Sequence, residues 1–119
     1  MPSTVMIGVG LELPHGAVGL VVHQDTVIGD RVKLYQGVTI GRADVHDTDS
    51  AGGGRVVIGD DVVIGANAVV LFRSGQTIEL RDRTVIGAGS VLLSGTGEDE
   101  VWAGNPARLV GRRKPANSQ

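Results

Sequence analysis

The sequence predicts an all-β chain that winds into a parallel β-helix of about four to five coils. Three observations lead to this prediction: an aliphatic residue or Met recurs every six residues, Gly often follows it, and Val, Ile and Thr are frequent. A six-residue period fits the two-residue alternation of a strand and drifts against the 3.6-residue period of a helix. One such unit cannot bury its own apolar side chain, so several must stack.

The repeating positions fall into four runs, and each run predicts a stack of short strands whose aliphatic side chains line the core. The repeating residues are Met1, Ile7, Leu13, Val22, Ile28, Leu34, Ile40, Ile58, Ile64, Val70, Leu80, Ile86 and Leu92. A small or aliphatic residue follows four positions later, as at Val32, Val38, Val62, Ala68, Thr84 and Ser90. Gly at a fixed offset marks a bend between units.

The breaks between the runs predict loops. The first lies in PHGAVGLVV (14–22), the second is the polar stretch ADVHDTDSAGGGR (43–55), and the third surrounds 72–75. After Leu92 the repeat ends at 95–100, and an extended piece follows at 101–104. We expect residues 1–111 to form one domain and residues 112–119 a flexible basic tail. Loops of a regular scaffold often carry function.

The composition supports a thin core and excludes several classes of protein. The chain has 119 residues, with 41% hydrophobic but only 3% aromatic residues. A net charge of −2 gives no general attraction to nucleic acid. Without an apolar run of about 18 residues or a secretory leader, we expect neither a membrane span nor export, and predict a cytoplasmic protein. The absence of Cys excludes disulfides and cysteine-thiolate catalysis.

Four segments of the chain carry a family resemblance. They are IGVGLELPH (7–15), YQGVTIG (35–41), IGAGSV (86–91) and AGNPAR (103–108). With these segments the chain resembles the hexapeptide-repeat acyltransferases, and within them the β-helical domain of serine O-acetyltransferases. The resemblance implies a left-handed helix, although general rules favour right-handed parallel crossovers. It also implies a homotrimer whose active sites lie between subunits.

The resemblance implies transfer of an acetyl group from acetyl-CoA to a small hydroxyl acceptor, with direct attack in a ternary complex and without a metal. The family's catalytic base matches His15, and histidine suits proton abstraction because its ordinary pKa is about 6.5. His46, on the polar loop, and Glu12 are further catalytic candidates. Glu12, or Asp44, Asp47 or Asp49 of an adjacent chain, could orient the base.

The donor and acceptor sites also have candidate residues from the resemblance. Backbone amides at coil corners and the closing motif predict acetyl-CoA contacts at Gly41, Ala66, Ala88, Asn105, Pro106 and Arg108. The basic residues 112–114 either face the nucleotide phosphates or form a solvated tail. Gln36, Arg42 and Arg55 are candidates for binding the acceptor. His23 is expected at a solvent-facing corner, and Trp102 over the end of the solenoid or at an interface.

Departures from the family pattern keep alternatives open. Pro14 precedes His15 where the serine enzymes have Asp, and the region near Arg55 lacks their second histidine. The acceptor is therefore serine, a sugar or a biosynthetic intermediate. A γ-type carbonic anhydrase, with zinc held by three histidines across subunits, and a scaffold without catalysis are the rival functions. The spacing of the histidines argues against the first, and the motif-bearing breaks argue against the second.

Overall fold

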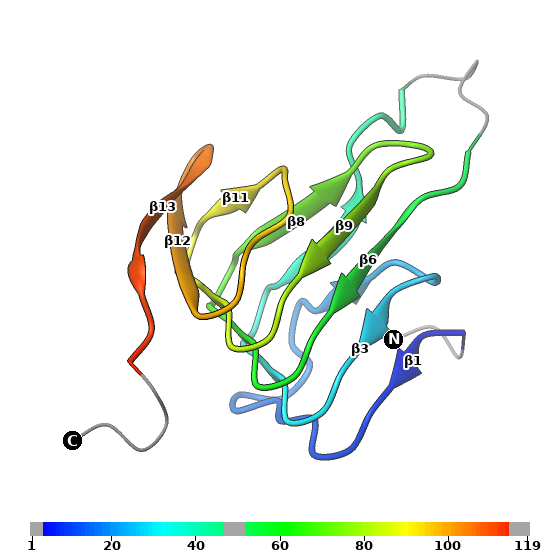
Figure 1. Cartoon of the computed structure of the whole chain (residues 1–119). Helices are drawn as coiled ribbons and strands as arrows, with labels where there is room; N and C mark the ends of the chain where they lie inside the picture. The colour runs from blue at the N-terminus through cyan, green and yellow to red at the C-terminus, as the bar shows by residue number, and fades with distance from the viewer. Residues whose placement is uncertain (1–3, 47–51, 115–119) are drawn as a thin grey trace.

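A computed structural model describes residues 4–46 and 52–114 of the chain (Figure 1). Within these ranges the strands are β1 (Met6–Ile7), β2 (Val21–Val22), β3 (Val27–Ile28), β4 (Lys33–Leu34), β5 (Thr39–Arg42), β6 (Arg55–Ile58), β7 (Val63–Ile64), β8 (Val69–Phe72), β9 (Thr77–Leu80), β10 (Val85–Ile86), β11 (Val91–Leu92), β12 (Glu100–Gly104) and β13 (Ala107–Arg112). None of the described residues forms a helix that could cross a membrane.

The strands stack into three sheets that form the sides of a prism. Face 1 has the order β1-β3-β6-β9, face 2 the order β4-β7-β10-β12-β13, and face 3 the order β2-β5-β8-β11. From β3 to β11, successive strands pass from face 1 to face 2 to face 3, and pairing between coils is parallel, as in Val27 with Val57 and Lys33 with Val63. The predicted parallel β-helix is confirmed.

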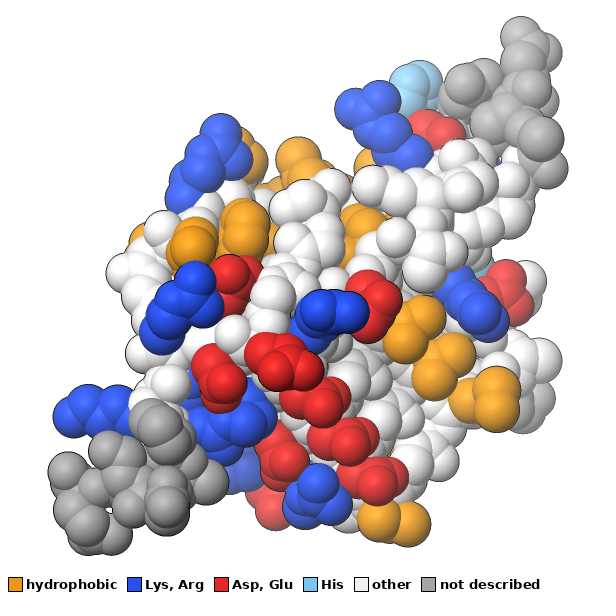
Figure 2. Space-filling model, viewed as in Figure 1, with side chains coloured by type: hydrophobic (Ala, Val, Ile, Leu, Met, Phe, Trp, Pro, Cys, Tyr) orange, Lys and Arg blue, Asp and Glu red, His pale blue; other side chains and the backbone are white. Residues whose placement is uncertain are grey.

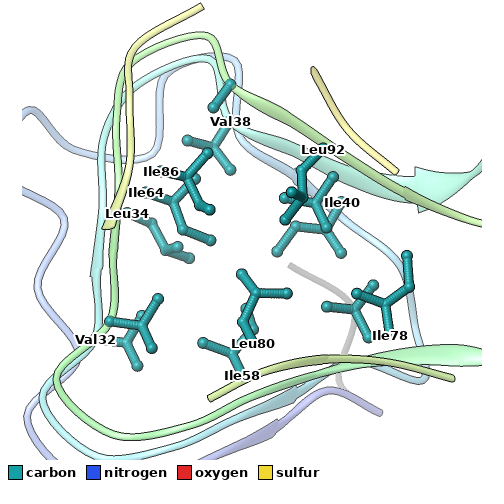
Figure 3. Packing of buried hydrophobic residues seen from close by; sticks show 14 of the residues in the cluster. Val32, Leu34, Val38, Ile40, Ile58, Ile64, Ile78, Leu80, Ile86 and Leu92 are labelled. Carbon is teal, nitrogen blue, oxygen red and sulfur yellow. The ribbon is translucent and has the colours of Figure 1, made fainter. Parts of the chain in front are cut away.

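Aliphatic side chains fill the interior of the prism, coil above coil (Figure 3). The repeating positions from Ile28 to Leu92 are at most 2% exposed, and Val22 is 4% exposed. The residues four positions later, Val32, Val38, Val62, Ala68, Thr84 and Ser90, are buried as well. Two inward side chains per six-residue unit therefore make the core, which explains why it needs few aromatic residues.

The edge between faces 1 and 2 is held by a ladder of aspartates, and we call it the aspartate edge. Asp30 Oδ1 accepts a hydrogen bond from Val9 N at 2.9 Å, and Asp60 Oδ1 accepts one from Asp30 N at 2.8 Å. Asp82 Oδ1 repeats the contact with Asp60 N at 2.8 Å. Acidic side chains gather along this edge in Figure 2. A Cβ on Gly59 would lie 2.4 Å from Asp82 Oδ1, so the Gly of the repeat makes room for the carboxylate.

The predicted breaks lie at the other two edges. Residues 14–19 form a turn between faces 2 and 3, which we call the His15 edge. The polar loop after β5 and the turn after β8 lie between faces 3 and 1, which we call the loop edge. Residues 47–51 of the loop, with Asp47 and Asp49, lie outside the described residues.

The chain closes with an antiparallel hairpin that the repeat does not predict. β12 extends face 2, as expected for an extended piece at 101–104, and β13 pairs back onto it with Trp102 opposite Leu109. β13 reaches Arg112, the first residue of the predicted tail. Beyond it, Arg113 N donates to Asp99 O at 2.5 Å, and residues 115–119 lie outside the described part of the chain. Residues 112–114 are thus tied to the prism.

Candidate functional site

The turn that carries His15 lies directly over a corner of the next coil. Gly37 N donates a hydrogen bond to Val18 O at 2.9 Å, and Gly16 N donates to Leu13 O at 2.9 Å within the turn. His15 is exposed, and its ring centroid lies 5.9 Å from that of Tyr35. The insertion of residues into the six-residue repeat therefore presents an accessible imidazole at the His15 edge.

The His15 edge continues through the corners of the later coils. Asn67 N donates to Gln36 O at 3.0 Å, and Gly89 N donates to Ala66 O at 2.8 Å. At the top of the column Gly104 N donates to Ser90 Oγ at 3.1 Å, which attaches the turn of the C-terminal hairpin to the same edge. The structure therefore places six predicted site residues along one edge: His15, Gln36, Ala66, Ala88, Asn105 and Pro106.

Gln36 on this edge and Arg108 near its end carry polar groups that can bind a ligand. Gln36 Oε1 is buried and has no hydrogen-bond partner among the described residues. Arg108 is exposed on β13, opposite Ala103, and its Nη1 donates only to Ala107 O at 3.3 Å. The guanidinium is therefore available to an anion near the end of the edge.

The loop edge holds a different set of predicted residues. Gly41 and Arg42 end β5, His46 follows in the loop, and Arg55 begins β6. Gly41 thus lies on face 3 near the loop edge, away from the corners of Ala66 and Ala88. Ala43, Asp44, His46 and Arg73 line an open hollow of about 290 Å³. The structure consequently divides the predicted site residues between two edges of the prism.

Asp44 anchors the described start of the loop. Its carboxylate accepts hydrogen bonds from Ser74 N and Ser74 Oγ, each at 3.2 Å, and lies 3.4 Å from Arg42 Nε. Partial desolvation alone would raise the pKa of Asp44, but the hydrogen bonds from Ser74 and the charge of Arg42 outweigh it and lower the pKa. Asp44 is therefore an anionic structural group that fixes the direction of Arg42.

Two other predicted residues, Glu12 and Arg55, have contacts that define their surroundings. Glu12 Oε2 lies 3.8 Å from Lys33 Nζ on face 2, and its carboxylate is paired with this residue rather than with His15. Arg55 lines an open hollow of about 320 Å³ on face 1 together with Asp25 and Thr26. Neither neighbour had been singled out from the sequence, because nothing in the repeat marks Asp25 or the buried Thr26 as part of a hollow.

His23 and Trp102 have structural contacts. His23 packs edge-on against Phe72 at 4.9 Å between ring centroids, and its Nδ1 accepts a hydrogen bond from Asp25 N at 3.2 Å. Trp102 packs against the core, and its Nε1 donates to Glu100 Oε1 at 3.0 Å. These contacts place Trp102 at the end of the solenoid.

Two basic residues of the predicted tail lie far from the His15 edge along the prism surface. Arg113 Nη1 donates to Asp61 O at 2.6 Å on the aspartate edge, and Arg83 Nη2 donates to Lys114 O at 2.5 Å. Arg112 Nη2 lies 3.7 Å from Glu100 Oε2. These contacts hold the tail to the protein and use the charge of residues 112 and 113.

Comparison with known proteins identifies the chain's relatives. Residues 55–94 match the model of the hexapeptide repeat of succinyl-transferase. A probable serine acetyltransferase of Oryza sativa is 40% identical over 113 residues, which cover 94% of this chain and 30% of the relative. The serine acetyltransferase of Brucella abortus in complex with coenzyme A superposes with a TM-score of 0.76 at 32% identity, covering 93% of this chain and 41% of that one.

The serine acetyltransferase of Neisseria gonorrhoeae in complex with serine superposes with a TM-score of 0.77 at 35% identity, covering 91% of this chain and 40% of that one. The chain belongs to the hexapeptide-repeat acyltransferases. It spans less than half the length of these relatives.

Membership of the hexapeptide-repeat acyltransferases gives the hand of the fold, which is a left-handed parallel β-helix. In the described residues no three side chains of His, Cys, Asp or Glu are arranged to hold a metal ion. His15, His23 and His46 belong to separate surroundings within the protomer, at the His15 edge, against Phe72 and in the polar loop.

Face 3, which joins the two edges, is apolar on its outer surface. Inward and outward residues alternate along its strands, and the outward residues are Val21, Thr39, Gly41, Val69, Leu71, Val91 and Leu93. Val21 is 58% exposed and Leu93 is 49% exposed. Outward positions of face 1 include the charged Arg55 and Glu79 beside Val27 and Val57, and those of face 2 include the charged Lys33 beside Val63 and Val85. Among the described strands, face 3 is therefore the side best suited to contact another protein.

Proposed function

We propose that this chain is the β-helical part of an acetyl-CoA-dependent O-acetyltransferase with serine as its acceptor. One observation carries the proposal: the exposed His15 shares an edge of the prism with the corner residues expected to bind the donor. The relatives that bind coenzyme A and serine support the two substrates. A cytoplasmic location, where acetyl-CoA is made and used, belongs to the same proposal.

In this proposal His15 is the general base. Its imidazole takes the hydroxyl proton of the acceptor while the hydroxyl oxygen attacks the thioester carbonyl carbon of acetyl-CoA. The C–S bond then breaks, and the CoA thiolate leaves and takes up the proton from the imidazolium. Backbone N–H groups of the edge corners donate to the developing oxyanion. No acyl-enzyme forms, which is compatible with a chain that has no Cys.

The donor lies along the His15 edge in this proposal. The pantetheine arm passes the corners of Ala66 and Ala88 toward Asn105 and Pro106, and Arg108 faces the nucleotide phosphates. The guanidinium of Arg108 is exposed and forms no ion pair with a carboxylate of the described residues, which supports this role. Arg113 is not needed for it, because its side chain is bound to Asp61.

The remaining predicted residues reach the same site from a neighbouring protomer. Gly41, Arg42, His46 and Arg55 lie at or beside the loop edge, whereas His15 and Gln36 lie at the His15 edge. In a homotrimer whose apolar faces 3 surround the threefold axis, the loop edge of one protomer meets the His15 edge of the next. Arg42 or Arg55 then binds the acceptor carboxylate. His46 completes the catalytic set from the neighbouring protomer, and Glu12 is a further candidate in the same protomer as His15, where its carboxylate pairs with Lys33.

The test is turnover of acetyl-CoA and serine, measured as release of free thiol. His15→Ala is expected to lower turnover by about 10²- to 10⁴-fold, the usual contribution of a general base. His23→Gln is the matched control, because His23 packs on Phe72 and is expected to leave turnover unchanged. Turnover of His15→Ala close to that of the unchanged chain would contradict the assignment of the base.

Binding of CoA provides a second measurement that is independent of the acceptor. A ligand that binds only the folded state raises the melting temperature by mass action. Millimolar CoA is expected to stabilise the unchanged chain, and Arg108→Ala is expected to reduce the shift. If CoA produces no shift in the unchanged chain, a scaffold without acyl transfer becomes the better description.

A further inference from the structure

Among the described residues of the protomer, no carboxylate contacts the imidazole of His15. Pro14 precedes it and offers no hydrogen-bonding side chain. Glu12, the nearest carboxylate in sequence, is exposed and lies 3.8 Å from Lys33 Nζ. Asp44 lies at the loop edge, where Ser74 and Arg42 engage it. Within the described part of the protomer, the direction of His15 therefore depends on a side chain of another kind.

The aromatic ring of Tyr35 is the side chain that the structure places against His15. The two ring centroids are 5.9 Å apart and the planes are tilted by 45°, which is within the range of attractive aromatic pairs. Among the described residues, neither ring forms a side-chain hydrogen bond or an ion pair. The contact is therefore one of packing.

Tyr35 is itself fixed by the coil that supports it. Tyr35 N donates to Ile64 O at 3.1 Å, and the preceding Leu34 N donates to Glu12 O at 3.0 Å. Leu34 is fully buried and Tyr35 is half-buried. The ring consequently projects from a rigid corner, whereas His15 projects from a turn.

The turn and this corner are held at a constant separation. Gly37 N binds Val18 O, and a Cβ on Gly19 would lie 3.3 Å from the Cα of Gly37. Because the backbones approach so closely, the ring of Tyr35 limits the directions that the His15 side chain can take. A side chain held in one direction presents its nitrogen to the acceptor more often.

We infer that Tyr35 is a positioning residue for His15, and that its ring takes the part played by a carboxylate in other general-base sites. The inference rests on the proposed function, because it assumes that His15 takes the proton. It assigns the effect to the ring rather than to the phenol hydroxyl.

The experiment compares Tyr35→Ala with Tyr35→Phe in the full chain. Tyr35→Ala is expected to lower kcat by about 10- to 100-fold, the cost of a misplaced catalytic group, and to change KM for acetyl-CoA by less than about twofold. Tyr35→Phe, which keeps the ring, is expected to retain kcat within about twofold. Melting temperature and molecular mass in solution show whether each variant keeps its fold and assembly.

The double variant His15→Ala/Tyr35→Ala separates positioning from an independent role. If Tyr35 acts through His15, the double variant turns over no more slowly than His15→Ala alone. The inference is overturned if the losses in kcat of the two single variants multiply in the double variant. It is also overturned if Tyr35→Ala keeps its kcat, or if Tyr35→Phe loses as much kcat as Tyr35→Ala. Each of these outcomes leaves His15 as the base. Failure of His15→Ala itself to reduce turnover would overturn the proposed function as well.

Discussion

At the scale of single residues, the corners of the helix require backbone conformations that few side chains adopt. Gly37, Asn67 and Gly89 occupy equivalent places on the His15 edge, with φ values of 73°, 60° and 70°. Gly37 also faces the next coil, because an added Cβ would lie 2.0 Å from Asn67 Oδ1. Gly89 also has a positive φ, but a Cβ added to it would have no atom within 4 Å.

Gly37→Ala is therefore expected to destabilise the protein more than Gly89→Ala. Both variants place an Ala at positive φ, which costs about 1–2 kcal/mol. Only Gly37→Ala must also displace the side chain of Asn67, and we expect an additional loss of about 1 kcal/mol. Urea unfolding measures the difference. Equal losses in the two variants would mean that Asn67 moves aside without cost, contrary to the close packing of this corner.

At the scale of elements, the C-terminal hairpin depends on one carboxylate. Glu100 Oε1 accepts hydrogen bonds from Gly97 N at 2.6 Å and from Trp102 Nε1 at 3.0 Å. These two bonds, in that order of importance, lower the pKa of Glu100 below its ordinary value. The carboxylate therefore stabilises the fold above the pKa of the unfolded chain, about 4.3. This contribution disappears as the pH falls through the lower pKa of the folded chain.

Acidification is therefore expected to change the emission of Trp102, the single Trp of the chain, below about pH 4.3. Glu100→Gln removes the titrating group, so its emission should not change over this range. It should also lose about 1 kcal/mol of stability at neutral pH, because a neutral amide accepts the two hydrogen bonds more weakly. Glu98→Gln, at an exposed position nearby, is the control and should keep the acid transition. The same acid transition in Glu100→Gln would assign it to another group.

The elements that the sequence predicted are those that obey its period. The inward position of Ile28, Ile58 and Leu80 follows from local spacing, and each coil repeats the same requirement. The hairpin of β12 and β13 lies outside the period, because β13 pairs in the antiparallel sense with residues close in sequence. The attachment of Arg113 to Asp61 joins distant residues that no motif relates, so the sequence left the tail as a free segment.

At the scale of the whole molecule, motif positions gave candidate site residues but not their distribution between two edges. His15 and Ala66 follow face 2, whereas Gly41 and Arg42 end a strand of face 3. Which edge a residue reaches depends on how many strands precede it in its coil and on the lengths of the inserted loops. A single protomer therefore holds two parts of the proposed site, and the apolar face 3 lies between them.

This arrangement predicts that assembly through face 3 is required for activity. Val69→Glu places a charge at an outward, half-buried position of β8 and is expected to dissociate the proposed trimer, because an unpaired buried charge is costly. Val63→Glu is the matched control, since Val63 is the outward, half-buried residue of β7 on face 2. Light scattering should show a protomer mass for Val69→Glu and a trimer mass for Val63→Glu. Turnover should fall to background only in the first, with its β-sheet circular dichroism retained. A trimeric Val69→Glu, or an active monomer, would place the subunit contact elsewhere or the whole site within one protomer.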